Sequence, residues 1–233
     1  MAKKVIIVSR GLIRKNKRVD WVSEIYASIL CKHNVLPIII PIAKETLQVL
    51  PNYLSDYDGI LMVEGGDVNP SLYNRNYAEP EELDTIKDEI ETTCYTHAYQ
   101  NNKSIMGFCR GLHIINVMLG GTLHKDVNEG NKKVQHIDYN NYDEFRHTIT
   151  IKPNTPLYEW YAQEQIEVNS YHHQGIENLG ENLVPMATSA DGLIEAVYAP
   201  SHKFLIGLQF HPERMLTEYE GNTKVFDAFI NSL

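Results

Sequence analysis

The chain alternates in its first half between short apolar runs and longer amphipathic stretches. Apolar runs of the length of a buried strand occupy residues 4–9, 35–40, 58–63 and 105–108. Stretches with the pattern of a helix occupy residues 20–32, 44–54, 83–101 and 112–119. This alternation predicts a mostly parallel sheet with helices on both faces. Pro37 and Pro41 flank the second run, which places its ends near the surface or at an edge of the sheet.

The alternation stops after Gly121. Short strands separated by turns are predicted at residues 148–151, 166–170, 193–198 and 204–210, and a closing helix at residues 222–230. We therefore expect an α/β fold of the flavodoxin-like kind, with a mostly parallel central sheet flanked by helices and an antiparallel extension in the C-terminal half. No repeat or linker divides the sequence, so a single domain is expected over residues 1–233.

Composition narrows the classes of partner. Of the 233 residues, 43% are hydrophobic and 22% are charged, which is typical of a globular protein. The net charge of −9 argues against nucleic acid, whose phosphates would be repelled. No apolar stretch approaches the roughly 20 residues of a membrane span, and residues 5–8 are too short a run for a signal peptide. The three cysteines form no CxxC motif, which is typical of free thiols in a reducing cytoplasm. The sequence leaves the oligomeric state open, and a homo-oligomer is possible.

A cysteine lies between the fourth predicted strand and the helix that follows it. Cys109 has Gly107 and Gly111 two places to either side, the nucleophile-elbow pattern with sulfur in place of a hydroxyl. A strand that turns into a helix through one residue strains that residue, and side chains at the two glycine positions would collide with neighbouring backbone. The turn sets the sulfur at a helix N-terminus, where a thiolate is favoured. A buried structural cysteine is the alternative; Cys31 and Cys94, each within a predicted helix, are expected to be such packing residues.

Other chemistry-bearing residues follow strands that end at the same edge. His211 comes just after the last predicted strand, and Glu213 can hold its second nitrogen and fix the tautomer. A thiolate that attacks an acyl carbon needs such a base, an orienting acid and an oxyanion site. We expect the oxyanion donors to be the amide of Arg110 and an amide of Gly65-Gly66, where the absence of side chains lets the backbone approach a substrate.

Together these features resemble the class I glutamine amidotransferase-like superfamily and, more closely, its γ-glutamyl-amide hydrolases of the γ-glutamyl-γ-aminobutyrate hydrolase type. The resemblance spans roughly residues 4–214. Its motifs are Gly65-Gly66-Asp67-Val68-Asn69-Pro70 with Tyr73, Gly107 to Gly111, Asn116-Val117 with Leu119 to Leu123, Val168 to Gln174, Asp191-Gly192 with Glu195, and Gln209 to Glu213.

The resemblance implies a catalytic triad of Cys109, His211 and Glu213, and no cofactor. It also implies that the Gly65-Gly66 loop and a second segment hold the glutamyl group; that segment comprises Ser170, Tyr171, His172, His173 and Gln174. His172-His173 could instead be a metal pair, but no carboxylate or third histidine has a matching local spacing, so no metal is expected.

One position departs from the family pattern. His113 stands where the family usually has a glutamine that positions the glutamyl substrate. An imidazole is shorter, has a different shape and can carry charge, so the substrate contact here differs. A histidine on the exposed start of a helix is the alternative. We expect His113 to tune recognition of the substrate rather than to do chemistry.

The leading functional expectation is a hydrolase that cleaves a γ-glutamyl amide through a thioester, releasing glutamate and an amine. A glutaminase subunit that supplies ammonia to a separate synthetase is the alternative, and a non-catalytic binding module is a third reading.

Residues 10–18 form a basic loop beside the cleft, before a helix with Asp20 as its N-cap. Arg10 or Arg14 could therefore contact an anionic group on the amine. A solvated loop without a ligand is the alternative.

Overall fold

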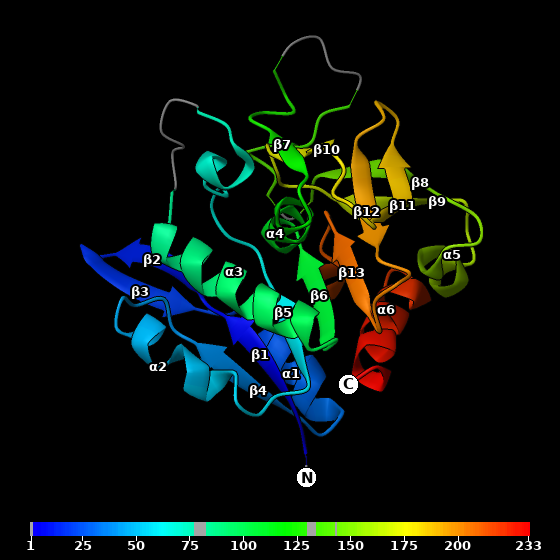
Figure 1. Cartoon of the computed structure of the whole chain (residues 1–233). Coiled ribbons are helices and arrows are strands. Elements are labelled where there is room, and N and C mark those ends of the chain that lie inside the picture. The colour runs from blue at the N-terminus through cyan, green and yellow to red at the C-terminus, as the bar shows by residue number, and fades with distance from the viewer. Residues whose placement is uncertain (1, 77–82, 130–133, 143) are drawn as a thin grey trace.

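One nine-stranded sheet runs through the molecule (Figure 1). The computed structural model describes residues 2–76, 83–129, 134–142 and 144–233. The strand order is β4-β1-β5-β6-β13-β12-β11-β8-β9. The first five strands in this order are parallel, and each of the last four runs antiparallel to its neighbours. The expected α/β fold, with a parallel core and an antiparallel extension on the C-terminal side, is confirmed.

The parallel half of the sheet is covered by helices on both faces. Its strands are β1 (Lys3–Val8), β4 (Val35–Ile40), β5 (Gly59–Met62), β6 (Ser104–Phe108) and β13 (Leu205–Leu208). Its helices are α1 (Glu24–Lys32), α2 (Thr46–Tyr53), α3 (Thr85–Gln100), α4 (Arg110–Met118) and α6 (Glu220–Asn231). Successive side chains of a strand point to opposite faces. Accordingly Val5 and Ile7 pack with α1 and α6, whereas Ile6 and Val8 pack with α2, α3 and α4. No helix in these described residues is both long and apolar enough to span a membrane.

The antiparallel half contains one helix and four strands of the sheet. These are α5 (Pro156–Tyr161), β8 (Arg146–Ile151), β9 (Gln165–Asn169), β11 (Val184–Ser189) and β12 (Ile194–Tyr198). Two further strands, β7 (Thr122–His124) and β10 (Gly175–Asn178), pair with each other, and two 3-10 helices cover Pro70–Tyr73 and Pro212–Met215. The assignment of residues 204–210 to the antiparallel extension was wrong. This segment is β13, which pairs parallel with β6 and so completes the parallel core.

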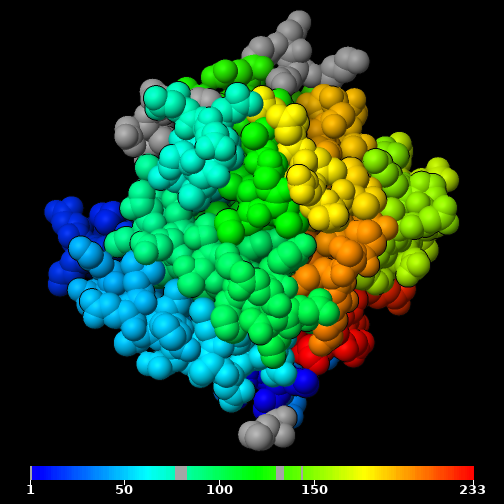
Figure 2. Space-filling model, in the orientation of Figure 1, coloured from blue at the N-terminus to red at the C-terminus, as the bar shows by residue number. Residues whose placement is uncertain are grey.

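A β-hairpin replaces the basic loop expected at residues 10–18. Strands β2 (Arg10–Arg14) and β3 (Lys17–Trp21) pair antiparallel, and the hairpin projects from one side of the molecule (Figure 2). The turn residues Lys15 and Asn16 have φ of 50° and 58°. Positive φ at both central residues is what a two-residue type I′ hairpin turn requires. The helix begins only at Glu24, with Ser23 rather than Asp20 as its N-cap.

Two further expectations concern an edge strand and the cysteines. Strand β4, with Pro37 inside it, is at the edge of the sheet as predicted. Cys94 is buried in α3. Cys31 is exposed, so the expectation that it packs on an apolar face was wrong. The buried face of α1 is formed by Tyr26, Ile29 and Leu30, and a rotation of one residue beyond Leu30 turns the thiol away from the core.

Candidate active site

The carboxyl ends of three neighbouring parallel strands form the edge on which the site is built. Strand β6 lies between β5 and β13, so the segments after these strands meet at one rim. The amide of Cys109 donates to the carbonyl of Leu208 at 2.7 Å, which sets the elbow beside the end of β13. A cavity of about 410 Å³ opens here, and Cys109, Gly65, Gly66 and His211 are among the residues that line it. Ligand sites of open parallel sheets lie at such carboxyl ends.

The elbow is strained at its central residue. Cys109 has φ 51° and ψ −105°, a conformation that side chains rarely adopt, and α4 begins at the next residue. A Cβ at Gly107 would lie 2.6 Å from the backbone of Gly111, and a Cβ at Gly111 would lie 2.3 Å from the carbonyl oxygen of Met62. The expected collisions at both glycines are therefore present, and they explain why the turn needs glycine on each side.

The imidazole of His211 lies between the thiol and a carboxylate. It lines the cavity together with Cys109, and its Nδ1 donates to Glu213 Oε1 at 2.7 Å. Asn169, at the end of β9, fixes the backbone of His211 with two hydrogen bonds. The side-chain amide of Asn169 donates to the His211 carbonyl oxygen, and the side-chain oxygen of Asn169 accepts from the His211 N–H, each at 2.8 Å. Burial alone would lower the pKa of His211, but the Glu213 carboxylate and the hydrogen bond with Cys109 outweigh it and raise the pKa to about 10.

Three side chains that the sequence did not single out support this pair. The Tyr26 hydroxyl lies 2.8 Å from Glu213 Oε1 and 2.9 Å from Glu64 Oε2, and it donates to one of the two carboxylates at a time. Arg214 forms ion pairs with both carboxylates, at 3.6 Å from Glu64 and 3.7 Å from Glu213. Burial opposes ionisation of Glu64, but the charges of His211 and Arg214 prevail and lower its pKa. Little in the sequence indicates that these residues belong to the site. Arg214 stands out only because it follows the His-Pro-Glu run, and Tyr26 is one aromatic residue on an apolar helix face.

The Arg110 side chain fixes the loop after β5. Its Nη1 donates to the carbonyl oxygens of Gly66 and Asp67 at 2.8 and 2.9 Å. The same guanidinium is buried and forms ion pairs with Asp88 and Glu91 of α3 at 2.7 and 2.8 Å. A Cβ at Gly65 would lie 2.4 Å from Arg110 Cδ. Glycine is therefore required at this position for the arginine to pass, in addition to the close backbone approach expected from the sequence.

The segment after β9 forms one wall of the cavity. Tyr171, His172, His173 and Gln174 line it, whereas Ser170 is buried behind it and donates to the carbonyl oxygen of His136 at 2.7 Å. His173 Nε2 lies 2.7 Å from Asp67 Oδ1, which joins this wall to the loop after β5.

His113 is also in the cavity lining, and it is buried rather than exposed. Its Nε2 is 2.8 Å from Gln209 Oε1. Burial, only partly offset by this hydrogen bond, lowers the pKa of His113 to about 4, so the ring is neutral near pH 7. The residue that departs from the family pattern thus faces the cavity from its floor, without charge.

Other lining residues of the cavity are aromatic or cationic. Arg10 and Trp21 line it from the hairpin, with the Arg10 guanidinium 5.6 Å from the Trp21 ring centroid. Arg214 lies 5.1 Å over the ring of Tyr142, which also lines the cavity. Arg14 is exposed near the hairpin turn and is not among the lining residues. Of the two arginines expected at the cleft, the structure brings only Arg10 to it.

Two groups of side chains in the described part of the chain could hold a metal ion. The first is Glu64, His211 and Glu213, whose polar atoms are already joined to Tyr26, Arg214 and one another. The second lies behind the cavity wall and comprises His136, His147, His172 and Glu195. The sequence search for a third histidine near His172-His173 missed this second group, because its members come from separate segments of the chain.

Comparisons with known proteins agree on one family. Residues 8–213 match the Peptidase C26 family. A glutamine amidotransferase-like protein, YvdE, from Lactococcus lactis is 34% identical over 196 residues, covering 83% of this chain and 81% of that protein. The γ-glutamyl-γ-aminobutyrate hydrolase PuuD from Escherichia coli is 29% identical over 238 residues, covering 94% and 88%. The crystal structure of a glutamine amidotransferase from Thermotoga maritima shares the fold, with a TM-score of 0.64 at 14% identity, over 100% of this chain and 96% of that one.

Proposed function

The chain belongs to the Peptidase C26 family and is a glutamine-amidotransferase-like hydrolase, and from this premise we propose that it cleaves the amide bond of a γ-glutamyl amide through a thioester on Cys109. The observation that carries the proposal is the His211–Glu213 hydrogen bond, with Cys109 and His211 in the lining of the same cavity. Thiol, imidazole and carboxylate in this order form the arrangement that activates a sulfur nucleophile.

The first half of the reaction transfers the glutamyl group to sulfur. The Cys109 thiolate attacks the γ-carbonyl carbon, and negative charge collects on its oxygen. We assign the stabilisation of that oxygen to the amides of Arg110 and the Gly65-Gly66 loop, each such donor being worth about 3–4 kcal/mol of barrier. His211, held protonated by Glu213, gives its proton to the departing nitrogen. The C–N bond breaks, and the amine leaves with that proton.

The second half of the reaction returns the free enzyme. His211 is now neutral and takes a proton from a water molecule that attacks the thioester carbon. The C–S bond breaks, glutamate leaves, and the sulfur again faces a protonated imidazole. Glu213 holds Nδ1 of His211 throughout, so Nε2 remains directed at the reacting atoms.

The lining residues support a division of the cavity between the two parts of the substrate. We place the glutamyl group against His113, His173 and the wall at 170–174, where neutral and polar groups converge. We place the amine against Arg10, Trp21 and Arg214. Two guanidinium groups beside aromatic rings favour an amine that carries a carboxylate or a phosphate-bearing group. A cytoplasmic location for this reaction rests only on the free cysteines.

The alternative, a glutaminase subunit, would hydrolyse free glutamine only with a synthetase docked over the rim. The deciding experiment supplies the purified protein alone with a panel of γ-glutamyl amides, including glutamine itself, and measures glutamate release. We expect turnover of γ-glutamyl amides with larger amines and little with glutamine. Turnover of glutamine alone, or turnover that appears only after a partner is added, would support the alternative. No turnover of any amide under either condition would argue for a binding module.

A further inference from the structure

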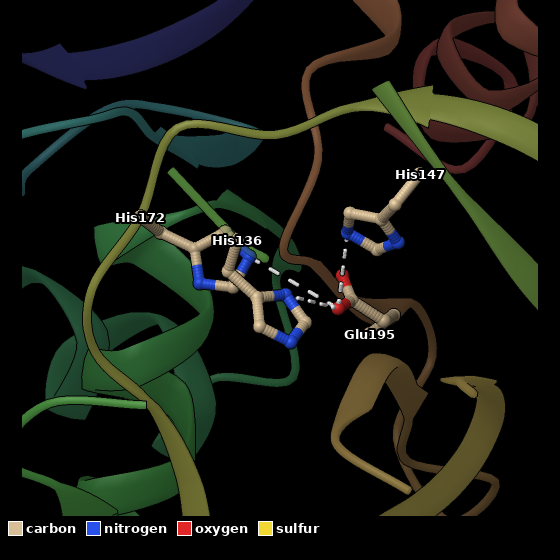
Figure 3. A group of neighbouring side chains, drawn as sticks. All are labelled: His136, His147, His172 and Glu195. Carbon is tan, nitrogen blue, oxygen red and sulfur yellow. Dashed lines mark ion pairs between the residues drawn. The ribbon is translucent and has the colours of Figure 1, made fainter. Parts of the chain in front are cut away.

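Three imidazoles and one carboxylate converge in the antiparallel half of the molecule (Figure 3). His136 precedes β8, His147 lies in β8, His172 follows β9, and Glu195 lies in β12. All four side chains are buried, none exposing more than 7% of its surface. In the proposed reaction none of the four performs a chemical step, although His172 is also part of the cavity wall.

The spacing within the group is too long for hydrogen bonds and suits ligands of a common ion. His136 Nδ1 and His147 Nε2 each lie 3.5 Å from Glu195 Oε1, and His172 Nε2 lies 4.0 Å from it. An N–H···O hydrogen bond measures about 2.7–3.2 Å. Around a tetrahedral zinc ion with bonds of about 2.0–2.1 Å, neighbouring ligand atoms lie about 3.3–3.5 Å apart. One ligand atom from each residue falls within 4.8 Å of the others.

Each imidazole has its outer nitrogen engaged and its inner nitrogen directed at the group. His136 Nε2 is 3.1 Å from the Asp191 carboxylate. His172 Nδ1 is 2.9 Å from the carbonyl oxygen of Gln174, and His147 Nδ1 is 3.3 Å from that of Thr148. Metal-binding histidines almost always donate their second N–H to a carboxylate or a backbone carbonyl in this way, because it fixes the tautomer and the ring orientation.

The inner atoms lack the partners that buried polar atoms normally have. Among the residues that the structure describes, no hydrogen-bond partner is found for either oxygen of Glu195, for Nε2 of His147 or for Nε2 of His172. An isolated carboxylate costs several kcal/mol to bury unless a positive charge compensates it. Both Glu195 oxygens and the inner nitrogens of His147 and His172 are therefore open to a bound cation.

We propose that His136, His147, His172 and Glu195 bind one zinc ion in a closed, tetrahedral, structural site. Four protein ligands leave no open position for water or substrate, which separates this role from zinc catalysis. The ion would tie β8 and β12 to the segment that carries His172 and so brace the wall of the cavity. The inference is independent of the proposed hydrolase activity, because it rests on residues that take no part in the reaction steps.

The test is metal analysis of the full chain, freed of any affinity tag, stripped with chelator and then dialysed against a slight excess of zinc. We expect one zinc ion per chain and a higher thermal midpoint with zinc than without. Glu195→Gln and His147→Gln should lose the ion. Asp191→Asn, which changes the outer partner of His136 but leaves all four ligand residues in place, should weaken zinc binding by about 10- to 100-fold.

Two control variants locate the ion. His202→Gln removes a half-buried imidazole in the turn beyond the other end of β12 and should keep one zinc ion per chain. Cys109→Ala should also keep it, which excludes binding at the thiol. If Glu195→Gln fails to fold, cobalt substitution of the unaltered chain decides, since tetrahedral nitrogen–oxygen coordination gives a more intense visible spectrum than octahedral coordination, without a sulfur charge-transfer band.

The proposal fails if the unaltered chain retains no zinc above background, in which case the group is a proton-linked network. It fails equally if the cobalt spectrum is octahedral or shows sulfur coordination. Retention of the ion in both Glu195→Gln and His147→Gln, or its loss in Cys109→Ala, would place the metal elsewhere and would also overturn the proposal.

Discussion

Two buried groups of histidine and glutamate lie side by side in this molecule and differ in what compensates their charge. At the catalytic rim, Glu213 accepts from His211, is within hydrogen-bonding distance of Tyr26 and lies near Arg214. In the histidine group, neither oxygen of Glu195 has a hydrogen-bond partner among the residues that the structure describes. Burial would lower the pKa of His211 but the Glu213 carboxylate outweighs it and raises this pKa to about 10, whereas burial prevails at Glu195 and raises the pKa of its carboxyl group to about 8.

The difference shows that residue type alone does not decide the chemistry of a buried site. Where a carboxylate has donors and a neighbouring cation, an imidazole beside it keeps its proton and can act as an acid. Where burial raises the pKa of the carboxyl group to about 8, as at Glu195, that group keeps its proton near pH 7, and a metal ion that binds there displaces the proton. The predictions below separate the two groups.

The largest effect is expected at the sulfur. Cys109→Ala should lower kcat by about 10⁴-fold or more, because without the thiolate no thioester forms. Steady-state assays on the best γ-glutamyl amide measure the loss. Zinc content and the thermal midpoint should stay close to those of the unaltered chain. Full activity in this variant would remove Cys109 from the mechanism.

The pH dependence of kcat/KM should depend on the charge of Glu213, because this charge raises the pKa of His211. We expect kcat/KM to fall as pH rises through about 10, when His211 loses its proton, and Glu213→Gln should move this limb to lower pH because the raising charge is gone. The folded state raises the pKa of His211 from 6.5 to about 10, so its stabilising contribution is complete below about pH 6.5 and is lost as pH rises through about 10. A limb that does not move in Glu213→Gln would contradict the assigned pairing.

The same substitution should have different effects on stability in the two groups. Glu213→Gln removes a charged hydrogen-bond acceptor and should cost about 1.5–3 kcal/mol of the free energy of unfolding. Glu195→Gln, in the metal-free protein, replaces a carboxyl group that burial already holds largely protonated near pH 7 by a neutral amide, so it should cost little or nothing. Denaturant titrations at pH 7 with chelator present compare the two. Equal losses would show that Glu195 has partners of its own.

A smaller effect is expected at the floor of the cavity. His113→Gln should change KM several-fold and kcat little, the signature of an altered contact that is equally strong in the ground and transition states. The ring is already neutral, so the change in shape rather than in charge should account for the effect. A collapse of kcat at unchanged KM would show that His113 takes part in the chemistry.

The smallest effect should distinguish the two arginines of the hairpin. Arg10→Ala should lower kcat/KM for anionic amides by a few-fold at low salt and leave neutral amides unaffected, in line with about 0.5–1 kcal/mol for a half-buried cation that still reaches solvent. Arg14→Ala is the matched control, since this side chain is outside the cavity lining. Equal responses of neutral and anionic amides in Arg10→Ala would remove charge from leaving-group recognition.

The parallel core could be predicted because its signals are local. Apolar runs and helical spacing identify elements directly, and the two glycines around Cys109 report collisions within a few residues of the chain. The hairpin was missed because its strands are short and charged, so the exposed apolar residues Leu12 and Val19 could not indicate a buried face. Strand β13 was misassigned because pairing direction depends on a neighbour far away in the sequence.

The residues at the rim of the cavity could be predicted from local sequence patterns, whereas the histidine group could not. Cys109, His211 and Glu213 follow recognisable strand ends, so they could be named from the sequence, although the parallel pairing of β13 with β6 that brings them together was not expected. His136, His147 and Glu195 meet His172 only through the order of the antiparallel strands, which no spacing in the sequence encodes. Tyr26 and Glu64 were missed for a similar reason, since their role depends on a contact between α1 and the end of β5.

The most direct test of the central claim is to observe the thioester. The unaltered protein is mixed with a γ-glutamyl amide, quenched in acid within the first turnover, and examined by intact-mass measurement and peptide mapping. We predict a transient adduct of one glutamyl group on the peptide that contains Cys109, and no adduct in Cys109→Ala. Glutamate release in the first turnover without any adduct on Cys109, or an adduct on another residue, would contradict the proposed mechanism.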